Sequence, residues 1–111
     1  MDDKLKPLRE QIDAIDIRIL DLLNQRARVA QQVGHVKAET NAPVFRPERE
    51  AQVLRGAAQR NPGPLADGDV QTIFREIMSA CRALERRAQS LLRRAGLPWN
   101  LSQGIHRRDS L

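Results

Sequence analysis

Residues 5–37 carry an apolar stripe that a short chain cannot bury against itself. After Pro7, no glycine or proline interrupts this segment before Gly34. Apolar side chains recur at the two heptad positions that face a partner helix: one series is Leu5, Ile12, Ile19 and Val33, and the other is Leu8, Ile15, Leu22, Val29 and Val36. The pattern predicts one helix roughly 50 Å long. The rest of the 111-residue chain is too short to cover the stripe, so we expect self-association.

A second, shorter helix is predicted after the long one. The long helix should end before Ala42-Pro43, and residues 44–46 should form an extended linker, because the residue before a proline avoids helical geometry. Pro47 at the first helical position, followed by Glu48, then starts a helix that runs to about Gln59.

The third predicted helix follows a break at residues 61–64, Asn-Pro-Gly-Pro. We expect Asp67 or Asp69 to cap it, and its apolar residues recur at helical spacing from Val70 to Leu91. It should end at Gly96. The sequence thus predicts an all-α domain over residues 1–95, and a basic C-terminal tail over residues 96–111 that is largely disordered.

Composition narrows the class of protein. No stretch approaches the roughly 20 apolar residues of a membrane span, and the charged N-terminus lacks a secretory signal. The only cysteine, Cys81, excludes an internal disulfide and is typical of a reducing cytoplasm. His35 and His106 lack suitable companions for a metal site, and no glycine-rich phosphate loop is visible, so we expect neither a metal nor a cofactor.

Two cations interrupt the stripe of the long helix. Arg26 occupies a position between Ile19 and Val33 where a charge is costly unless it is paired. Lys37 follows 11 residues later, close to three helical turns, so it projects from nearly the same face. The pair indicates a buried anionic ligand. The alternative is that Arg26 pairs with a core carboxylate or fixes the register of a dimer.

Arg9 is predicted to act from a second subunit. It lies 17 residues before Arg26, which turns it roughly 100° away on an ideal helix. In an antiparallel pair of long helices, Arg9 of the partner subunit would instead approach the site. The alternative is an exposed arginine paired with Asp13.

The later helices carry weaker candidates for the same site. Arg49 and Glu50 follow Pro47-Glu48, and by themselves they favour an acidic helix N-terminus with a solvated arginine. Cys81 and Glu85 lie one turn apart on the third helix. Cys81 alone is typical of a small core residue, and Glu85 of a surface ion pair.

In ordered combination, these segments resemble the all-helical chorismate mutases, in particular the N-terminal mutase domain of bifunctional mutase–prephenate dehydratases. The resemblance covers about residues 4–92. The segments that carry it are LREQIDAID (8–16), LLNQR (22–26), VGHVK (33–37), VFRPERE (44–50) and IFREIMSAC (73–81).

The resemblance implies a three-helix protomer that forms an intertwined six-helix homodimer with two sites. It implies rearrangement of chorismate to prephenate in phenylalanine and tyrosine biosynthesis. Arg26, Arg49 and the partner's Arg9 would hold the substrate carboxylates. Lys37 would donate to the ether oxygen, and Glu50 would accept from the ring hydroxyl.

The sequence departs from the family pattern at three positions. Arg46 stands where an aspartate often helps to hold the ring hydroxyl, and Cys81 replaces a serine that contacts a carboxylate. Glu85 replaces a glutamine that donates to the ether oxygen. We therefore expect Glu85 to act when protonated and activity to be greatest in mildly acidic solution.

Two other functions are compatible with the composition. The net charge of +5 and the paired arginines 86–87, 93–94 and 107–108 would suit a basic helical dimer that binds nucleic acid. Acidic residues interspersed along the first two helices, and the lack of stacking aromatics, argue against it. The other possibility is a mutase-like partner of another shikimate-pathway enzyme.

Overall fold

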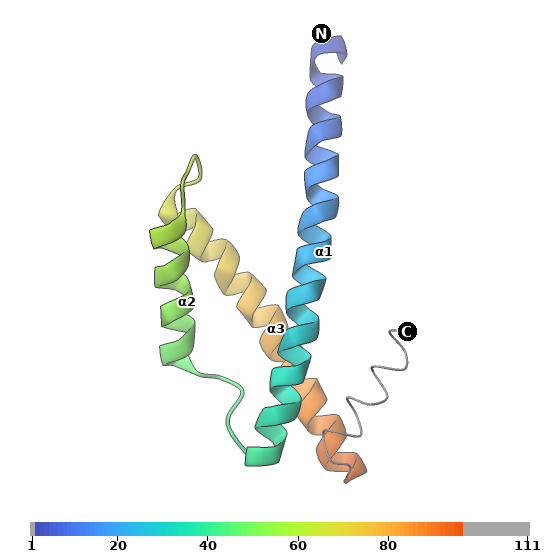
Figure 1. The fold of residues 1–111 in the computed structure, drawn as a ribbon, viewed down its shortest axis with the longest axis vertical. Helices are drawn as coiled ribbons and strands as arrows, with labels where there is room; N and C mark the ends of the chain where they lie inside the picture. The colour runs from blue at the N-terminus through green and yellow to red at the C-terminus, as the bar shows by residue number, and fades with distance from the viewer. Residues whose placement is uncertain (1, 97–111) are drawn as a thin grey trace.

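The computed structural model describes residues 2–96 and confirms the all-helical prediction. It contains α1 (Asp2–Thr40), α2 (Pro47–Arg60) and α3 (Asp67–Ala95), and the described residues form no strand. α3 packs across the C-terminal half of α1 and against α2, while the N-terminal half of α1 extends alone (Figure 1). The predicted domain boundary falls at the end of α3. Beyond Gly96, the predicted tail lies outside the described residues.

The end of α1 is fixed by its own main chain and by α3. Asn41 takes the left-handed conformation with φ 57°, and the Ala42 N–H donates to the Lys37 carbonyl at 2.9 Å, the hydrogen bond of a Schellman motif. Gln89 donates to the Ala42 carbonyl at 3.2 Å, and Arg93 donates to the Asn41 side chain at 2.9 Å. These contacts attach the α1–α2 linker to α3.

Gly34 allows α1 and α3 to touch through their main chains. A Cβ atom added at Gly34 would lie 2.9 Å from both Cα and the carbonyl oxygen of Glu85, closer than real Cβ contacts. Glycine inside a helix costs about 1 kcal/mol relative to alanine. In return, Gly34 lets α1 and α3 cross closely, and the crossing brings Glu85 near Lys37.

The predicted cap of α3 was wrong. The N-cap residue is Ala66, and no side chain makes the capping hydrogen bond. The Asp67 carboxylate instead accepts from the Asn61 side-chain amide at 2.8 Å, and the same amide donates to the Leu65 carbonyl at 2.7 Å. Asp67 and Asp69 lie in the first turn, where negative charge is favourable. The other end agrees with the prediction, since Gly96 is the left-handed C-cap at φ 64°.

The chain is more extended than a compact globular domain of its length. Its radius of gyration is 18.0 Å, against about 13 Å for a compact domain of this length. All described side chains between residues 3 and 22 are exposed, including stripe residues Ile12 and Ile19 at 56% and 47%. The buried apolar residues lie elsewhere: Ala30, Val44, Met78, Cys81, Ala88 and Leu92. Within the described residues, no helix is apolar over a length sufficient to cross a bilayer.

Candidate active site

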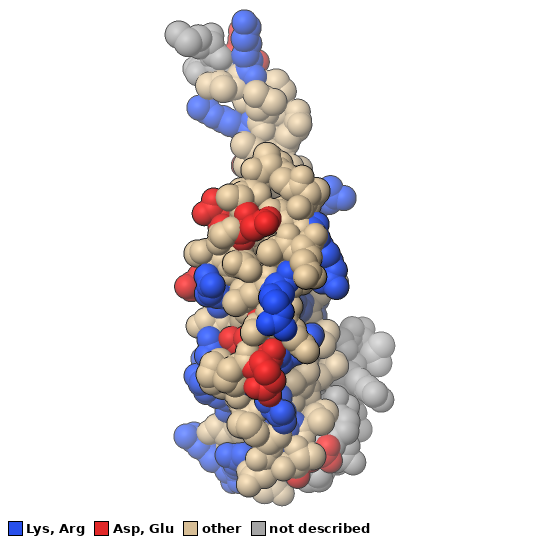
Figure 2. Space-filling view, turned by 90° about the vertical axis from the view of Figure 1, so that its left-hand side faces the viewer, with Lys and Arg blue, Asp and Glu red and all other residues tan. Residues whose placement is uncertain are grey.

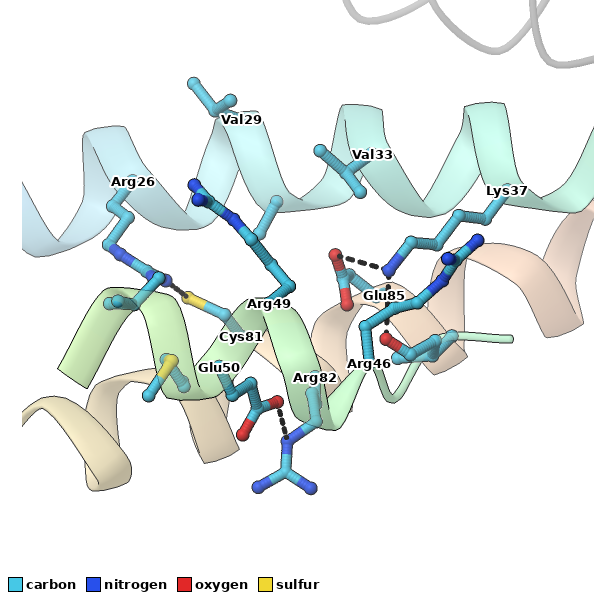
Figure 3. A pocket seen from close by; sticks show the side chains of 14 residues that line it. Arg26, Val29, Val33, Lys37, Arg46, Arg49, Glu50, Cys81, Arg82 and Glu85 are labelled. Carbon is cyan, nitrogen blue, oxygen red and sulfur yellow. Dashed lines mark hydrogen bonds and ion pairs between the residues drawn. The ribbon is translucent and has the colours of Figure 1, made fainter. Parts of the chain in front are cut away.

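A pocket of about 260 Å³ lies where the C-terminal half of α1, the linker, α2 and α3 meet. Its side chains converge from both sides of the gap between α1 and α2 (Figure 3). The apolar part of the lining is Val29, Ala30, Val33, Val44, Val53 and Met78. The polar part is Arg26, Lys37, Arg46, Arg49, Glu50, Cys81, Arg82 and Glu85. Cations thus outnumber carboxylates in a largely apolar hollow, which suits an anionic ligand.

Arg26 and Lys37 face the same pocket, as their spacing predicted. The Arg26 guanidinium donates to Cys81 Sγ at 3.0 Å, a weak acceptor that leaves its positive charge uncompensated. No carboxylate of the described residues lies within ion-pair distance of Arg26. The alternative of a partner carboxylate within the described chain therefore fails, and the charge remains available to a ligand.

Lys37 is held by two groups from different segments. Its ammonium donates to the Val44 carbonyl in the linker at 2.9 Å and lies 3.9 Å from Glu85 Oε1. The Lys37 side chain is only 18% exposed. Because the linker is attached to α3 through Gln89 and Arg93, the ammonium is fixed in position before any ligand arrives.

Glu85 is a buried acid, with 8% of its surface exposed. Burial raises the pKa of the Glu85 carboxyl above its ordinary value, because desolvation disfavours the charged form. The Lys37 ammonium and the Arg26 guanidinium act in the opposite direction and lower the pKa, whereas Glu50 raises it further. The net direction is upward, so the proton is retained to higher pH than in an exposed glutamate.

Arg49 and Glu50 reach the pocket from the first turn of α2. Arg49 makes only a long contact of 3.4 Å with Gln52, so its guanidinium is not tightly engaged. Glu50 lies 3.0 Å from the Nε atom of Arg82 on α3. Arg46, which replaces the aspartate expected from the resemblance, lines the pocket and makes a loose, exposed ion pair with Glu48 at 3.8 Å.

On α3, the sequence analysis missed two residues that line the pocket, Met78 and Arg82. They lie on one face of α3 with Cys81 and Glu85, at the helical spacing of three and four residues. That spacing was the available signal. Arg82 lies beside the apolar stripe of the helix and was considered only as a neighbour of Glu85 in a surface ion pair.

Arg9 is absent from this pocket. It lies on the exposed N-terminal half of α1, roughly 25 Å along the helix from Arg26. The described structure shows no ion pair between Arg9 and Asp13, the alternative considered above. A single protomer therefore does not bring Arg9 to the other candidate residues.

Comparisons with known proteins agree with the resemblance to chorismate mutases. The family model for chorismate mutase type II matches residues 8–86. The bifunctional chorismate mutase/prephenate dehydratase of Pseudomonas aeruginosa is 53% identical over 89 residues, which cover 76% of this chain and 24% of that protein. Its counterpart in Neisseria gonorrhoeae is 49% identical over 86 residues, which cover 78% and 23%. The chain thus spans about a quarter of the length of these curated relatives.

Two solved structures match this chain over nearly the whole of their own length. A chorismate mutase (form II) from Thermus thermophilus superposes with a TM-score of 0.74 at 34% identity, covering 76% of this chain and 96% of that chain. The Helicobacter pylori chorismate mutase in complex with prephenate gives a TM-score of 0.73 at 27% identity, covering 79% and 96%.

Proposed function

The chain belongs to the chorismate mutase type II family, and from this premise we propose that it is an isomerase that rearranges chorismate to prephenate, in the biosynthesis of phenylalanine and tyrosine. One observation carries the proposal: several cations and a buried acid of raised pKa line one pocket of a family member. Chorismate has two carboxylates, a ring hydroxyl and an enolpyruvyl ether. The pocket offers a complementary group to each.

The cations would fix the reactive shape of the substrate. In the proposal, Arg26, Arg49 and Arg9 of the partner subunit bind the two carboxylates, and Glu50 accepts from the ring hydroxyl. Cys81 accepts from the Arg26 guanidinium at 3.0 Å and so orients it. A flexible dianion held in this way spends more time in the compact conformer in which its reacting carbons meet.

The reaction is a rearrangement of bonds within a single substrate molecule. A carbon–oxygen bond breaks while a carbon–carbon bond forms, and negative charge builds on the ether oxygen. Lys37, fixed by the Val44 carbonyl, donates to that oxygen and stabilises the transition state more than the ground state. Glu85 donates to the same oxygen in its protonated form, which its raised pKa favours.

The functional unit is proposed to be an intertwined homodimer. The exposed stripe of α1 supports this, because Ile12 and Ile19 remain about half exposed in the protomer. Antiparallel pairing of two such helices would cover both stripes. It would also bring the partner's Arg9 toward the Arg26 end of the pocket.

The nucleic-acid alternative has weaker support. The face that α2 presents carries basic and acidic side chains interspersed, without a continuous basic stripe (Figure 2).

We propose a cytoplasmic location, where the free thiol of Cys81 stays reduced and can accept a hydrogen bond from Arg26.

The test is an absorbance assay of chorismate loss by the purified protein, with prephenate identified as product. Wild-type protein should convert chorismate without added metal or cofactor. Lys37→Met should reduce kcat about 100-fold or more while helicity by circular dichroism is unchanged. No turnover by folded protein, or turnover only after a second pathway enzyme is added, would reject the assignment as an independent mutase.

A further inference from the structure

Arg82 contacts the one carboxylate that the proposed function reserves for the ring hydroxyl. Its Nε atom lies 3.0 Å from Glu50 Oε2, although the buried N–H is not aligned with the oxygen, so the contact is an ion pair and not a hydrogen bond. The two side chains are 26% and 21% exposed. A pair at this depth is less screened by solvent than one on the open surface.

The same guanidinium lies over an aromatic ring of the linker. The Arg82 guanidinium carbon is 4.9 Å from the centre of the Phe45 ring, a distance typical of a cation–π contact. One side chain from α3 thereby touches both the linker and α2. Stacking restricts the guanidinium and so fixes where the Glu50 carboxylate is held.

A carboxylate in this pocket needs such a partner. Glu50 shares the pocket with Arg26, Lys37 and Arg49, the cations proposed to bind the substrate. If Glu50 were free to turn toward them, it would compete with the substrate carboxylates for the same charges. In the structure, the Glu50 carboxylate turns instead toward Arg82 and points away from Arg26 and Lys37 (Figure 3).

We propose that Arg82 is a positioning residue that engages one oxygen of Glu50, leaving the other to accept from a hydroxyl of the ligand, and keeps this carboxylate away from the substrate-binding cations. The inference rests on the proposed function and deepens it. Its direct consequence is selectivity for a dianion that carries a hydroxyl group.

The experiment is a double-mutant cycle on chorismate turnover. Arg82→Met retains the aliphatic stem against Phe45 but removes the charge, Arg82→Lys restores it, and Arg86→Met is the control on the exposed face of the same helix. We expect Arg82→Met to raise KM about fivefold with a smaller change in kcat. Arg82→Lys should recover part of that loss, and Arg86→Met should match wild type.

The background variant Glu50→Gln separates positioning from general structure. It removes the charge that competes for the cations, so adding Arg82→Met should then change KM no further. An equal rise in KM in both backgrounds, or none in either, would overturn the inference while the proposed function stands. Wild-type protein that does not convert chorismate would overturn both.

Discussion

The two halves of α1 share one apolar stripe but differ in what covers it. Between residues 3 and 22, all described side chains are exposed in the protomer. Between residues 26 and 37, Ala30, Gly34 and His35 are buried, and Arg26 and Lys37 line the pocket. The periodicity is the same in both halves, but only the second reaches another helix of the same chain.

In the proposed function, the N-terminal half of α1 serves dimer assembly and the C-terminal half serves the chemistry. The C-terminal half has its partner in α3, through the close approach of Gly34 to Glu85. The N-terminal half extends beyond the other described helices, and its apolar stripe stays exposed. Substitutions in the two halves should therefore fail in different ways, which the following experiments exploit.

The largest effect is expected from charges in the N-terminal stripe. Ile12→Asp with Ile19→Asp places two carboxylates in the proposed dimer seam, each costing about 3 kcal/mol or more. Because proteins of this size have roughly 5–15 kcal/mol of stability, the double variant should unfold. Circular dichroism and sedimentation would show loss of helix together with loss of the dimer.

Ile17→Asp is the matched control, since Ile17 is 68% exposed and lies off the stripe. It should remain folded and dimeric. A double stripe variant that stays helical, monomeric and active would contradict the assignment of the N-terminal half to an interface.

The next effect joins the two halves in one site. Arg9→Ala and Arg26→Ala should each reduce kcat/KM about 100-fold or more with little change in helicity. If Arg9 acts across the interface, a heterodimer of the two variants contains one intact site. An equal mixture should then regain about one quarter of wild-type activity after subunit exchange. Continued inactivity, despite exchange shown by mass labelling, would place both arginines in the site of one protomer.

The smallest effect concerns Glu85 at the crossing. Its raised pKa means that the protonated, donating form persists to higher pH than in a free glutamate. Turnover should therefore be greatest in mildly acidic solution and fall as pH rises through that raised pKa. Glu85→Gln donates at any pH, so its profile should be flat and its activity above neutrality severalfold higher than that of wild type.

The same substitution has a consequence for stability. A carboxyl whose pKa is raised in the folded state is bound to its proton more tightly there, so the stability of wild type falls as pH rises through the unfolded and then the folded pKa. Glu85→Gln should thus be the more stable protein at neutral pH, by an amount that shrinks in acid.

For the activity prediction, a wild-type pH profile that is already flat from about pH 5 to 9 would show that Glu85 does not act as the proton donor.

The sequence was sufficient where the signal is local or strictly periodic. The heptad pattern predicted the long helix, Pro47 predicted the start of α2, and Gly96 predicted the end of α3. The interval of 11 residues between Arg26 and Lys37 was enough to predict that both face the same pocket, because helix geometry alone places their side chains on one face of α1.

Contacts between elements were not available from the sequence. Asp67 is not the cap because the helix already begins at this residue, and its carboxylate accepts a hydrogen bond from Asn61, six residues earlier. Arg82 was missed because its partners Glu50 and Phe45 belong to α2 and the linker, and nothing in α3 alone predicts their approach. The burial of Glu85 likewise depends on how closely α1 crosses α3.

That crossing has a consequence for how such a site can change during evolution. Since Gly34 meets the main chain of Glu85, the spacing of the two helices is set by backbone atoms and not by the side chains that face the pocket. In the proposed function, replacement of Glu85 would change the proton donor that the substrate meets, while the spacing of the two helices would stay the same. Under that proposal, variation at residue 85 would change how the reaction depends on pH without the compensating changes that a repacked core would require.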